Sequence, residues 1–424
     1  MRAAPVSFGM TTSLLAGRAL ALIAVLAAAP AAAQTRVDVP AEAPSAEARP
    51  ADSLAVSLLT MLPGREVYSL FGHSAIRIRD DARGVDRAYN FGTFDFDQPF
   101  FLVRFLRGRL DYILDTAPFA AELAHYQALG RPIIEQRLTL SPAAARELYE
   151  ALEVNARPEN RAYRYDFFFN NCSTRLLDVL DAATRAAGDG PVRLGRAGAT
   201  TTFRQMLRPY TRGTPTLAMG MDLGIGLPAD RTATDREQAF LPVGLADALD
   251  RASVGGQPLV ASRDTLFWVA GAGEVPARTE PLVPLALVVL GLAWAAAALR
   301  PARFARTGRV ADVALFSVAG VAGVLVAFLW FGTDHTVTGP NLNLLWTFPT
   351  HLGLAVAAGR GRVSRAWRLY AGVSAALALL VPVLHVAGVQ GYPAGALLLS
   401  VAVAVRGARI ALDRPSSDAS GGVS

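Results

Sequence analysis

The chain is poor in residues that form disulfides or bind metals. Its 424 residues include a single cysteine, Cys172, and five histidines. One thiol excludes a disulfide within the chain, and only His73 and His125 precede residue 280. Because a structural zinc site usually takes four Cys or His ligands, this part of the sequence predicts no metal site. Nothing in it indicates a cofactor, and we found no internal repeat of the length typical of solenoids.

The N-terminus indicates export from the cytoplasm. Arg2 and Arg18 precede the apolar run "ALALIAVLAAAP", and the small-residue stretch "AAAQ" follows it. This pattern predicts a secretory signal peptide over residues 1–33, cut after Ala33. The run is not followed by a cysteine, which argues against a lipoprotein signal. Residues 34–50 are rich in Pro, Ala and Glu and predict a flexible linker.

The C-terminal third is too apolar for an ordinary soluble domain. Five apolar runs predict an all-α transmembrane domain of about five helices over residues 281–406, followed by a tail at 407–424. The first four runs are long enough to cross a hydrocarbon core of roughly 30 Å, and the fifth is marginal. The runs are 281–299, 313–331, 342–359, 369–389 and 392–405.

Arginine placement predicts the orientation of these spans. Clusters of arginine follow the first, third and fifth runs, whereas the connections "GTDHTVTGPN" and "QG" contain neither Arg nor Lys. Since basic residues in short loops stay on the cytoplasmic side, the N-terminal half lies outside and the C-terminus inside. Much of the formal net charge of +6 then belongs to membrane anchors. We therefore expect no nucleic-acid partner.

Residues 51–275 predict an α+β domain. "HSAIRIRD" (73–80) and "RAYNFGTFDF" (87–96) alternate with period two on either side of a turn, as paired strands do. "FAAELAHYQAL" (119–129) predicts a helix and "PIIEQRLTL" (132–140) a strand. "SPAAARELYEAL" predicts a helix with Ser141 as its cap.

Cys172 lies where an aromatic stretch gives way to a helix. Asn170 and Asn171 precede it, and the leucines from Leu176 onward recur at helical spacing. The thiol is thus expected in the first helical turn, where free backbone amides and the helix dipole favour the thiolate and lower the thiol pKa. Asn171 is expected to serve as the helix cap and also as an oxyanion donor.

A reactive thiol needs a base, and His73 is the better candidate. His125 lies in an ordinary helical pattern, whereas His73 begins a strand after a glycine. Asn90 or Tyr89, on the following strand, would orient its ring. Alternatively, the cysteine is a small buried apolar residue and the histidine is structural. An unpaired thiol in an oxidising compartment favours the catalytic interpretation.

These motifs resemble a known family. "YSLFGHSAIRIRD", "YNFGTFDF", "YRYDFFFNNCSTR" and "PNLNLLWTFPTHL" are similar to those of the Lnb family of bacterial lipoprotein N-acyltransferases. The order His, polar residue, Cys also resembles the permuted branch of the NlpC/P60 papain-like superfamily. The resemblance implies a periplasmic papain-like domain on the bacterial inner membrane. It also implies Cys172 as nucleophile, His73 as base and Asn90 as the orienting residue.

The function implied by the resemblance is acyl transfer. The acyl donor would be a phospholipid, Cys172 would carry the acyl group as a thioester, and a lipoprotein amine would accept it. A peptidoglycan amidase or endopeptidase of NlpC/P60 type, or a non-enzymatic lipid-binding scaffold, are the alternatives. The apolar and basic strip "FFLVRFLRGR" (100–109) predicts contact with the outer leaflet, although a core helix with a solvated basic face also fits.

Three polar features near the membrane are further candidates. Asn343 and His351 fall in the third apolar run, where rise per residue places His351 near mid-membrane. Polar residues within spans are often functional, but hydrogen bonding between helices is the alternative role. Asp334 and His335, in an outer loop, are expected to approach the periplasmic site.

Overall fold

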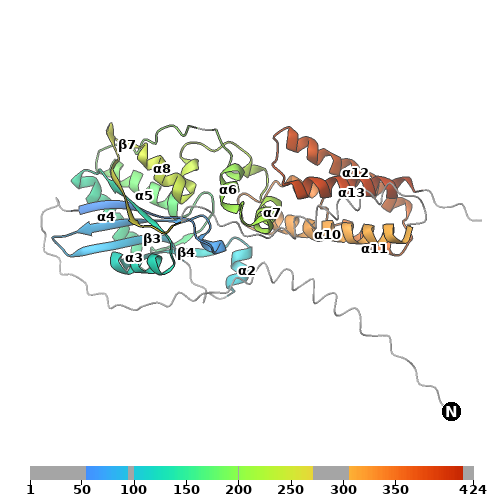
Figure 1. Ribbon diagram of the computed structural model, residues 1–424, viewed down its shortest axis with the longest axis horizontal. Helices are drawn as coiled ribbons and strands as arrows, with labels where there is room; N and C mark the ends of the chain where they lie inside the picture. The colour runs from blue at the N-terminus through green and yellow to red at the C-terminus, as the bar shows by residue number, and fades with distance from the viewer. Residues whose placement is uncertain (1–53, 94–99, 199, 271–304, 414–424) are drawn as a thin grey trace, which may run out of the picture. The chain divides into compact units, whose positions relative to one another are not determined.

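The computed structural model describes residues 54–93, 100–198, 200–270 and 305–413 (Figure 1). The predicted signal peptide, linker and first apolar run lie outside these residues. The strands are β1 (Leu54–Met61), β2 (His73–Asp80), β3 (Val85–Thr93), β4 (Asp111–Pro118), β5 (Ile133–Leu138), β6 (Ala162–Arg164), β7 (Ser253–Val254), β8 (Gln257–Pro258) and β9 (Val260–Phe267). The helices are α2 (Phe101–Leu106), α3 (Phe119–Ala128), α4 (Pro142–Ala156), α5 (Cys172–Ala186), α6 (Phe203–Thr211), α7 (Pro215–Gly224), α8 (Pro242–Asp250), α10 (Ala305–Phe331), α11 (His351–Gly359), α12 (Arg365–Val386) and α13 (Ala394–Leu412).

A seven-stranded antiparallel sheet forms the centre of the N-terminal domain. Its order is β6-β4-β3-β2-β1-β5-β9, so β2 lies between β1 and β3. In the β1–β2 register Met61 is opposite His73, which puts His73 at the end of its strand. The two strands predicted around the turn at residues 81–84 are confirmed, and the sheet adds β1, β4, β6 and β9, which the sequence patterns did not indicate.

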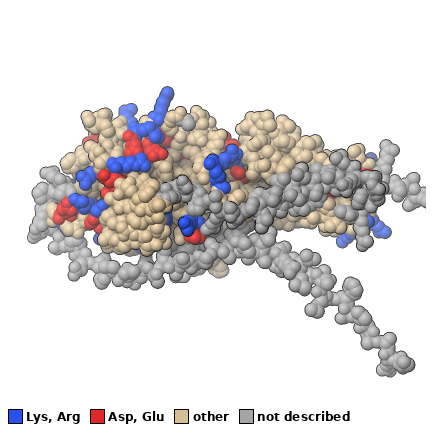
Figure 2. Space-filling model, viewed as in Figure 1, with Lys and Arg blue, Asp and Glu red and all other residues tan. Residues whose placement is uncertain are grey.

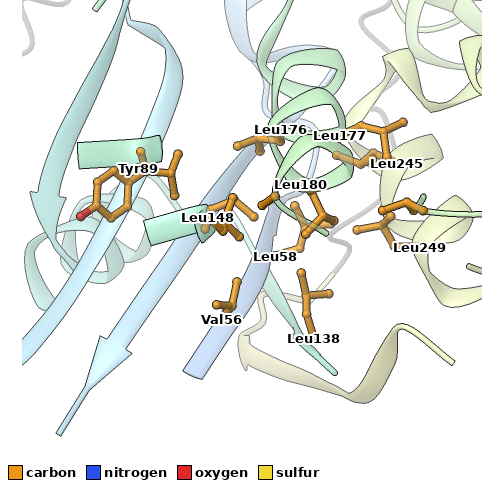
Figure 3. Close-up of a cluster of buried hydrophobic side chains, with 14 of the residues drawn as sticks. Val56, Leu58, Tyr89, Leu138, Leu148, Leu176, Leu177, Leu180, Leu245 and Leu249 are labelled. Atoms are coloured by element: carbon orange, nitrogen blue, oxygen red, sulfur yellow. The ribbon is translucent and has the colours of Figure 1, made fainter. Parts of the chain in front are cut away.

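Helices cover both faces of this sheet (Figure 1). The larger core joins one face to α4, α5 and α8 and includes Leu58, Ile76, Leu148, Leu177 and Leu245 (Figure 3). Residues that alternate with these along the strands, such as Leu59, Ala75 and Ala88, pack on the other face against Phe119 and Tyr126 of α3. On β2, α3 therefore covers the face that carries His73 near the start of the strand, at Ala75.

The predicted helix caps of this domain are confirmed. Ser141 precedes α4 and its hydroxyl accepts a hydrogen bond from the Ala144 amide, with Pro142 at the first helical position. Asn171 precedes α5 and its side chain accepts from the amides of Ser173 and Thr174. The α+β class of the predicted domain, followed by membrane helices, is likewise confirmed.

Three of the described helices are long and apolar enough to cross a membrane. They are Gly308–Phe331 within α10, the whole of α12 and the whole of α13. The marginal fifth run is therefore a full-length helix, which extends to Leu412. In Figure 2 charged side chains gather over the sheet domain, whereas the visible surface of the membrane helices is mostly uncharged.

The third apolar run is not the continuous helix that its length predicts. Residues Leu342–Leu345 form a single 3-10 turn, and α11 begins only at His351. Pro349 lies in the break, and the residue before a proline is disfavoured in helical conformation. The Asn341 side chain accepts a hydrogen bond from the Asn343 amide and so caps the short turn. His351 thus begins a helix instead of lying within one, and its ring centre lies 5.3 Å from that of Phe316, near the middle of the span Gly308–Phe331.

The two ends of the helix bundle differ in charge. At one end Arg406 of α13 forms a buried ion pair with Asp312 of α10, with Nε to Oδ1 2.5 Å, and Gly361 approaches Arg309. At the other end the connections free of Arg and Lys contact the sheet domain. For example, the Gly391 amide donates to Asp230. The alternation of arginines along the sequence therefore corresponds to two opposite ends in space.

A buried arginine joins the second of these ends to the sheet domain. Arg204 of α6 is 2% exposed and donates to Asp230 at 2.8 Å and to Asp222 at 2.7 Å. Asp230 also accepts the Gly391 amide, and the Asn343 side chain donates to the Asp222 carbonyl at 3.1 Å. The Asn341 side chain donates to the Leu223 carbonyl at 2.9 Å, so both connections free of Arg and Lys are bound to the segment that follows α6.

Candidate active site

The two predicted reactive residues lie together at the end of the sheet. His73 is the first residue of β2 and Cys172 the first of α5. A methyl group built on Gly92 of β3 would lie 3.7 Å from Cβ of Cys172, 3.8 Å from Cε1 of His73 and 4.0 Å from the Tyr163 hydroxyl. Gly92 has a φ of +106°, a conformation that favours glycine. Its missing side chain leaves a space that these three groups surround.

Asn90 orients the imidazole ring. Nε2 of His73 lies 3.1 Å from Oδ1 of Asn90, which is 6% exposed. An amide oxygen can only accept a hydrogen bond, so this contact assigns the proton to Nε2 and leaves Nδ1 as the acceptor. Tyr89, the alternative orienting residue, points to the opposite face and donates to Glu153. Of the two, Asn90 is the residue that contacts His73.

Two charged residues that the sequence did not single out surround this pair. Asn90 donates a hydrogen bond to Glu122 of α3, and burial, with the nearby Asp115 charge, raises the pKa of Glu122 to about 7. Arg131 is buried, donates to the Leu62 carbonyl and lies 4.9 Å from the Tyr126 ring centre. Neither residue belongs to a sequence motif, because each reaches the site through the packing of α3 and β5 on the strands.

The side chain of Asn171 is fully used by structural hydrogen bonds. Its Oδ1 accepts from the Ser173 and Thr174 amides at 2.8 and 3.0 Å. Its Nδ2 donates to the carbonyls of Phe167 and Phe240 at 2.7 and 2.9 Å. Since an amide nitrogen has two hydrogens, none remains for a substrate oxygen. Of the two roles predicted for Asn171, the structure supports the helix cap and contradicts the oxyanion donor.

The thiol environment also differs from the expectation. Burial raises the pKa of the Cys172 thiol above its ordinary value, although the Ser74 amide and the Ser173 hydroxyl and amide face the sulfur and oppose this. Burial, together with the positive charge of Arg131, lowers the pKa of His73 to about 4. Desolvation thus outweighs the helix-terminus effect, because it disfavours both charged forms. At neutral pH the site holds a thiol and a neutral imidazole.

The outer loop after α10 lies against the segment that leads to Cys172. Asp334 accepts hydrogen bonds from Arg109 at 2.8 Å and from Arg164 at 2.6 Å, and its amide donates to the Arg107 carbonyl. The Thr336 hydroxyl donates to Asp166 at 2.6 Å. The loop therefore contacts the periplasmic domain through its carboxylate and hydroxyl groups, and its approach to the reactive pair itself stays a prediction.

The other polar candidates take structural positions. Nε2 of His351 donates to the Trp346 carbonyl at 3.2 Å, and Nδ1 accepts a hydrogen bond from the Tyr370 hydroxyl of α12 at 2.8 Å. Asn343 bonds to backbone carbonyls near the end of α7. Hydrogen bonding between segments, the alternative role given to both residues, is what the structure shows. In the described ranges, no three His, Cys, Asp or Glu residues are grouped so as to hold a metal ion.

Comparison with models of known protein families identifies the family of this chain. A sequence model described as the Lnb N-terminal periplasmic domain matches residues 42–208, and one described as the Lnb transmembrane domain matches residues 276–414. The chain belongs to the Lnb family. Comparison with curated proteins and with solved structures gave no significant match. As an Lnb protein it is a membrane protein of lipoprotein processing, with its N-terminal domain in the periplasm.

The neutral state of the site predicts the pH dependence of thiol alkylation in this Lnb protein. Because the pKa of Cys172 is raised, the rate of reaction with iodoacetamide should keep rising as the pH passes the ordinary thiol pKa of about 8.5. Cys172 is the single cysteine, so mass spectrometry of the intact protein measures its labelling directly. N-acetylcysteine serves as the control for the reagent. A rate that levels off below about pH 7 would instead indicate a thiolate paired with imidazolium.

Proposed function

We propose that the protein transfers a fatty acyl group from a phospholipid, through a thioester on Cys172, to the N-terminal amine of bacterial lipoproteins. The observation that carries this proposal is the meeting of Cys172 and the Asn90-bound His73 at Gly92. A nucleophile, a base and a residue that orients the base are the groups that acyl transfer requires. Membership of the Lnb family supports a lipoprotein substrate.

In the first half-reaction the thiol attacks the ester carbonyl of the lipid. Nδ1 of His73 takes the thiol proton as the sulfur–carbon bond forms. The Asn90 oxygen accepts a hydrogen bond from Nε2–H of His73 throughout. The bond between the carbonyl carbon and the glycerol oxygen then breaks. The imidazolium returns its proton to that oxygen, and a lysophospholipid leaves. Since the resting pair is neutral, charge develops only during the reaction.

In the second half-reaction the neutral α-amine of the lipoprotein attacks the thioester. His73 takes a proton from the attacking nitrogen, the carbon–sulfur bond breaks, and the proton passes to the departing sulfur. An amide and the original thiol result.

The proposed domain boundaries follow the sequence patterns. Residues 1–33 are the signal peptide, 34–50 the linker, 51–275 the catalytic domain and 407–424 a cytoplasmic tail.

A lipid donor is supported by an exposed apolar patch on α2, which we call the α2 patch. It consists of Phe100, Val103 and Leu106, whose exposed fractions are 81%, 53% and 46%. The amide of Asp334, three residues after the end of α10, donates to the carbonyl of Arg107 next to this helix. The α2 patch is therefore tied to the outer end of a membrane helix, where lipid would cover it. The side chains of Phe101 and Phe105, also predicted to meet lipid, lie outside the described residues.

The alternatives fit these observations less well. A peptidoglycan amidase or endopeptidase has no use for an apolar patch at the membrane surface. A non-enzymatic scaffold has no use for a histidine whose tautomer is fixed next to a thiol. Comparison of lipoprotein N-termini and of muropeptides, by mass spectrometry in cells with and without the protein, separates the three. A change confined to the muropeptides would favour the amidase, and no change in either would favour the scaffold.

Substitution of the nucleophile tests the covalent step. Cys172→Ala should abolish lipoprotein acylation while the protein still inserts in the membrane. Wild-type protein incubated with phospholipid, without acceptor, should gain one acyl group that hydroxylamine releases, and the variant should gain none. His125→Gln, on the exposed side of α3, is the matched control and should keep full activity. Normal acylation by Cys172→Ala would exclude the thioester mechanism.

The α2 patch predicts a measurable depth in the bilayer. In a Cys172→Ala background, an environment-sensitive fluorophore attached at Val103→Cys should emit at shorter wavelength and be quenched by nitroxide-labelled lipids. The control is Val154→Cys on α4, which is similarly exposed at 45% but far along the chain from α2. Its fluorophore should report water and escape quenching. Equal quenching at the two positions would refute membrane contact by α2.

The charge of the bundle ends supports a cytoplasmic C-terminus. Arg368 donates to the carbonyl of Asp413, so the chain leaves α13 at the arginine-rich end. Because that end should face the cytoplasm, a reporter fused after residue 413 should be active only as a cytoplasmic fusion. A tag at Pro50 should be accessible to protease added to the periplasm. Activity of a periplasm-specific reporter at the C-terminus would reverse the assignment.

A further inference from the structure

Acyl transfer needs hydrogen-bond donors for the oxyanion of the tetrahedral intermediate, and the start of α5 supplies fewer than its position suggests. The amides of Ser173 and Thr174 are bonded to the Asn171 side chain, and the Asn171 amide donates to the Thr174 hydroxyl. The amide of Cys172 faces its own sulfur and remains next to the reacting atom. Outside the helix the Ser74 amide also faces the sulfur, and a side chain near the reacting atom can add a further donor.

Tyr163 presents a suitable group. Its ring is buried, packed edge-on against Phe91 with centroids 5.8 Å apart. Its hydroxyl is buried and has no hydrogen-bond partner in the described part of the chain. The same hydroxyl borders the space over Gly92, together with Cys172 and His73. A buried hydroxyl without a partner costs stability, so its retention beside a reactive thiol points to a ligand that completes it.

The surroundings of Tyr163 favour a hydrogen-bond donor. Burial, and then the proximity of Cys172, raise the pKa of the phenol, so that it keeps its proton at neutral pH. The guanidinium of Arg175, one turn into α5, lies 4.5 Å from the ring centre. This cation on the ring face opposes the increase in the phenol pKa and makes the O–H group a stronger hydrogen-bond donor.

We propose that the Tyr163 hydroxyl donates a hydrogen bond to the acyl oxygen in both half-reactions, in the space over Gly92. This inference rests on the proposed function, because it requires Cys172 to attack a carbonyl. As the sulfur–carbon bond forms, the carbonyl electron pair moves to oxygen, and the Tyr163 hydrogen stabilises that charge without being transferred. The pair returns to re-form the C=O bond when the glycerol oxygen leaves. The Cys172 amide is the second donor.

Tyr163→Phe tests this role, since it removes one oxygen atom and keeps the ring. In the full-length protein with diacyl phospholipid, the single-turnover rate of Cys172 acylation should fall by about 10²- to 10³-fold. Alkylation of Cys172 by iodoacetamide should be unchanged, because displacement of iodide creates no oxyanion. The thermal unfolding midpoint should be equal or higher, since an unsatisfied buried hydroxyl is lost.

Tyr112→Phe is the matched control, because its ring lies 6.4 Å from that of Tyr163 in the same aromatic cluster. It should acylate at the wild-type rate. The inference is overturned if Tyr163→Phe acylates within about twofold of wild type, if its alkylation falls in parallel, or if Tyr112→Phe loses as much. If only the role of Tyr163 is wrong, Cys172→Ala is still inactive in lipoprotein acylation. If the proposed function is wrong, Cys172→Ala keeps this activity.

Discussion

The geometry of the site depends on the capped start of helix α5. The Asn171 side chain satisfies two amides of the first turn and binds the carbonyls of Phe167 and Phe240, so it joins the helix to the chain before it and to the start of α8. Ser173, the next residue but one, has its hydroxyl 3.3 Å from that of Ser74 on β2. Cys172 lies between these anchors and His73 precedes Ser74. The distance between Cys172 and His73, the proposed nucleophile and base, is therefore set by two buried polar contacts that lie outside the pair.

Enclosure of the site explains its charge state. The face of β2 that carries His73 is covered by α3, and Arg131 adds a positive charge near the ring. Both conditions favour neutral imidazole, and burial favours the neutral thiol. An ion pair formed in advance would have to overcome this desolvation. Stabilisation confined to the transition state avoids that cost, and it raises the turnover rate more than tight binding of the ground state does. The unpaired hydroxyl of Tyr163 fits the same logic, because it gains its partner only when charge develops.

Local patterns in the sequence predicted local structure well. The alternation from His73 to Asp80 and the Ser141–Pro142 cap are properties of a few neighbouring residues, and the structure has both. The saturation of Asn171 could not be predicted, since one of its partners, Phe240, is remote in sequence. For the same reason Glu122 and Arg131 carried no signal, whereas Tyr163 opens the motif "YRYDFFFNNCSTR" but was not singled out within it. The third apolar run shows the reverse case, in which hydropathy predicted a span although a local signal, Pro349, was present to break it.

The attachment of the periplasmic domain to the membrane helices uses contacts of unequal strength. Asp334 and its arginine partners are each more than 40% exposed, and such surface ion pairs contribute little to stability. Arg204 is almost fully buried between two carboxylates, and loss of one partner from a buried pair costs about 3–5 kcal/mol. The Arg204 cluster, with the Asn343 and Gly391 backbone contacts, thus fixes the domain to the bundle, while the Asp334 loop can exchange partners at low cost.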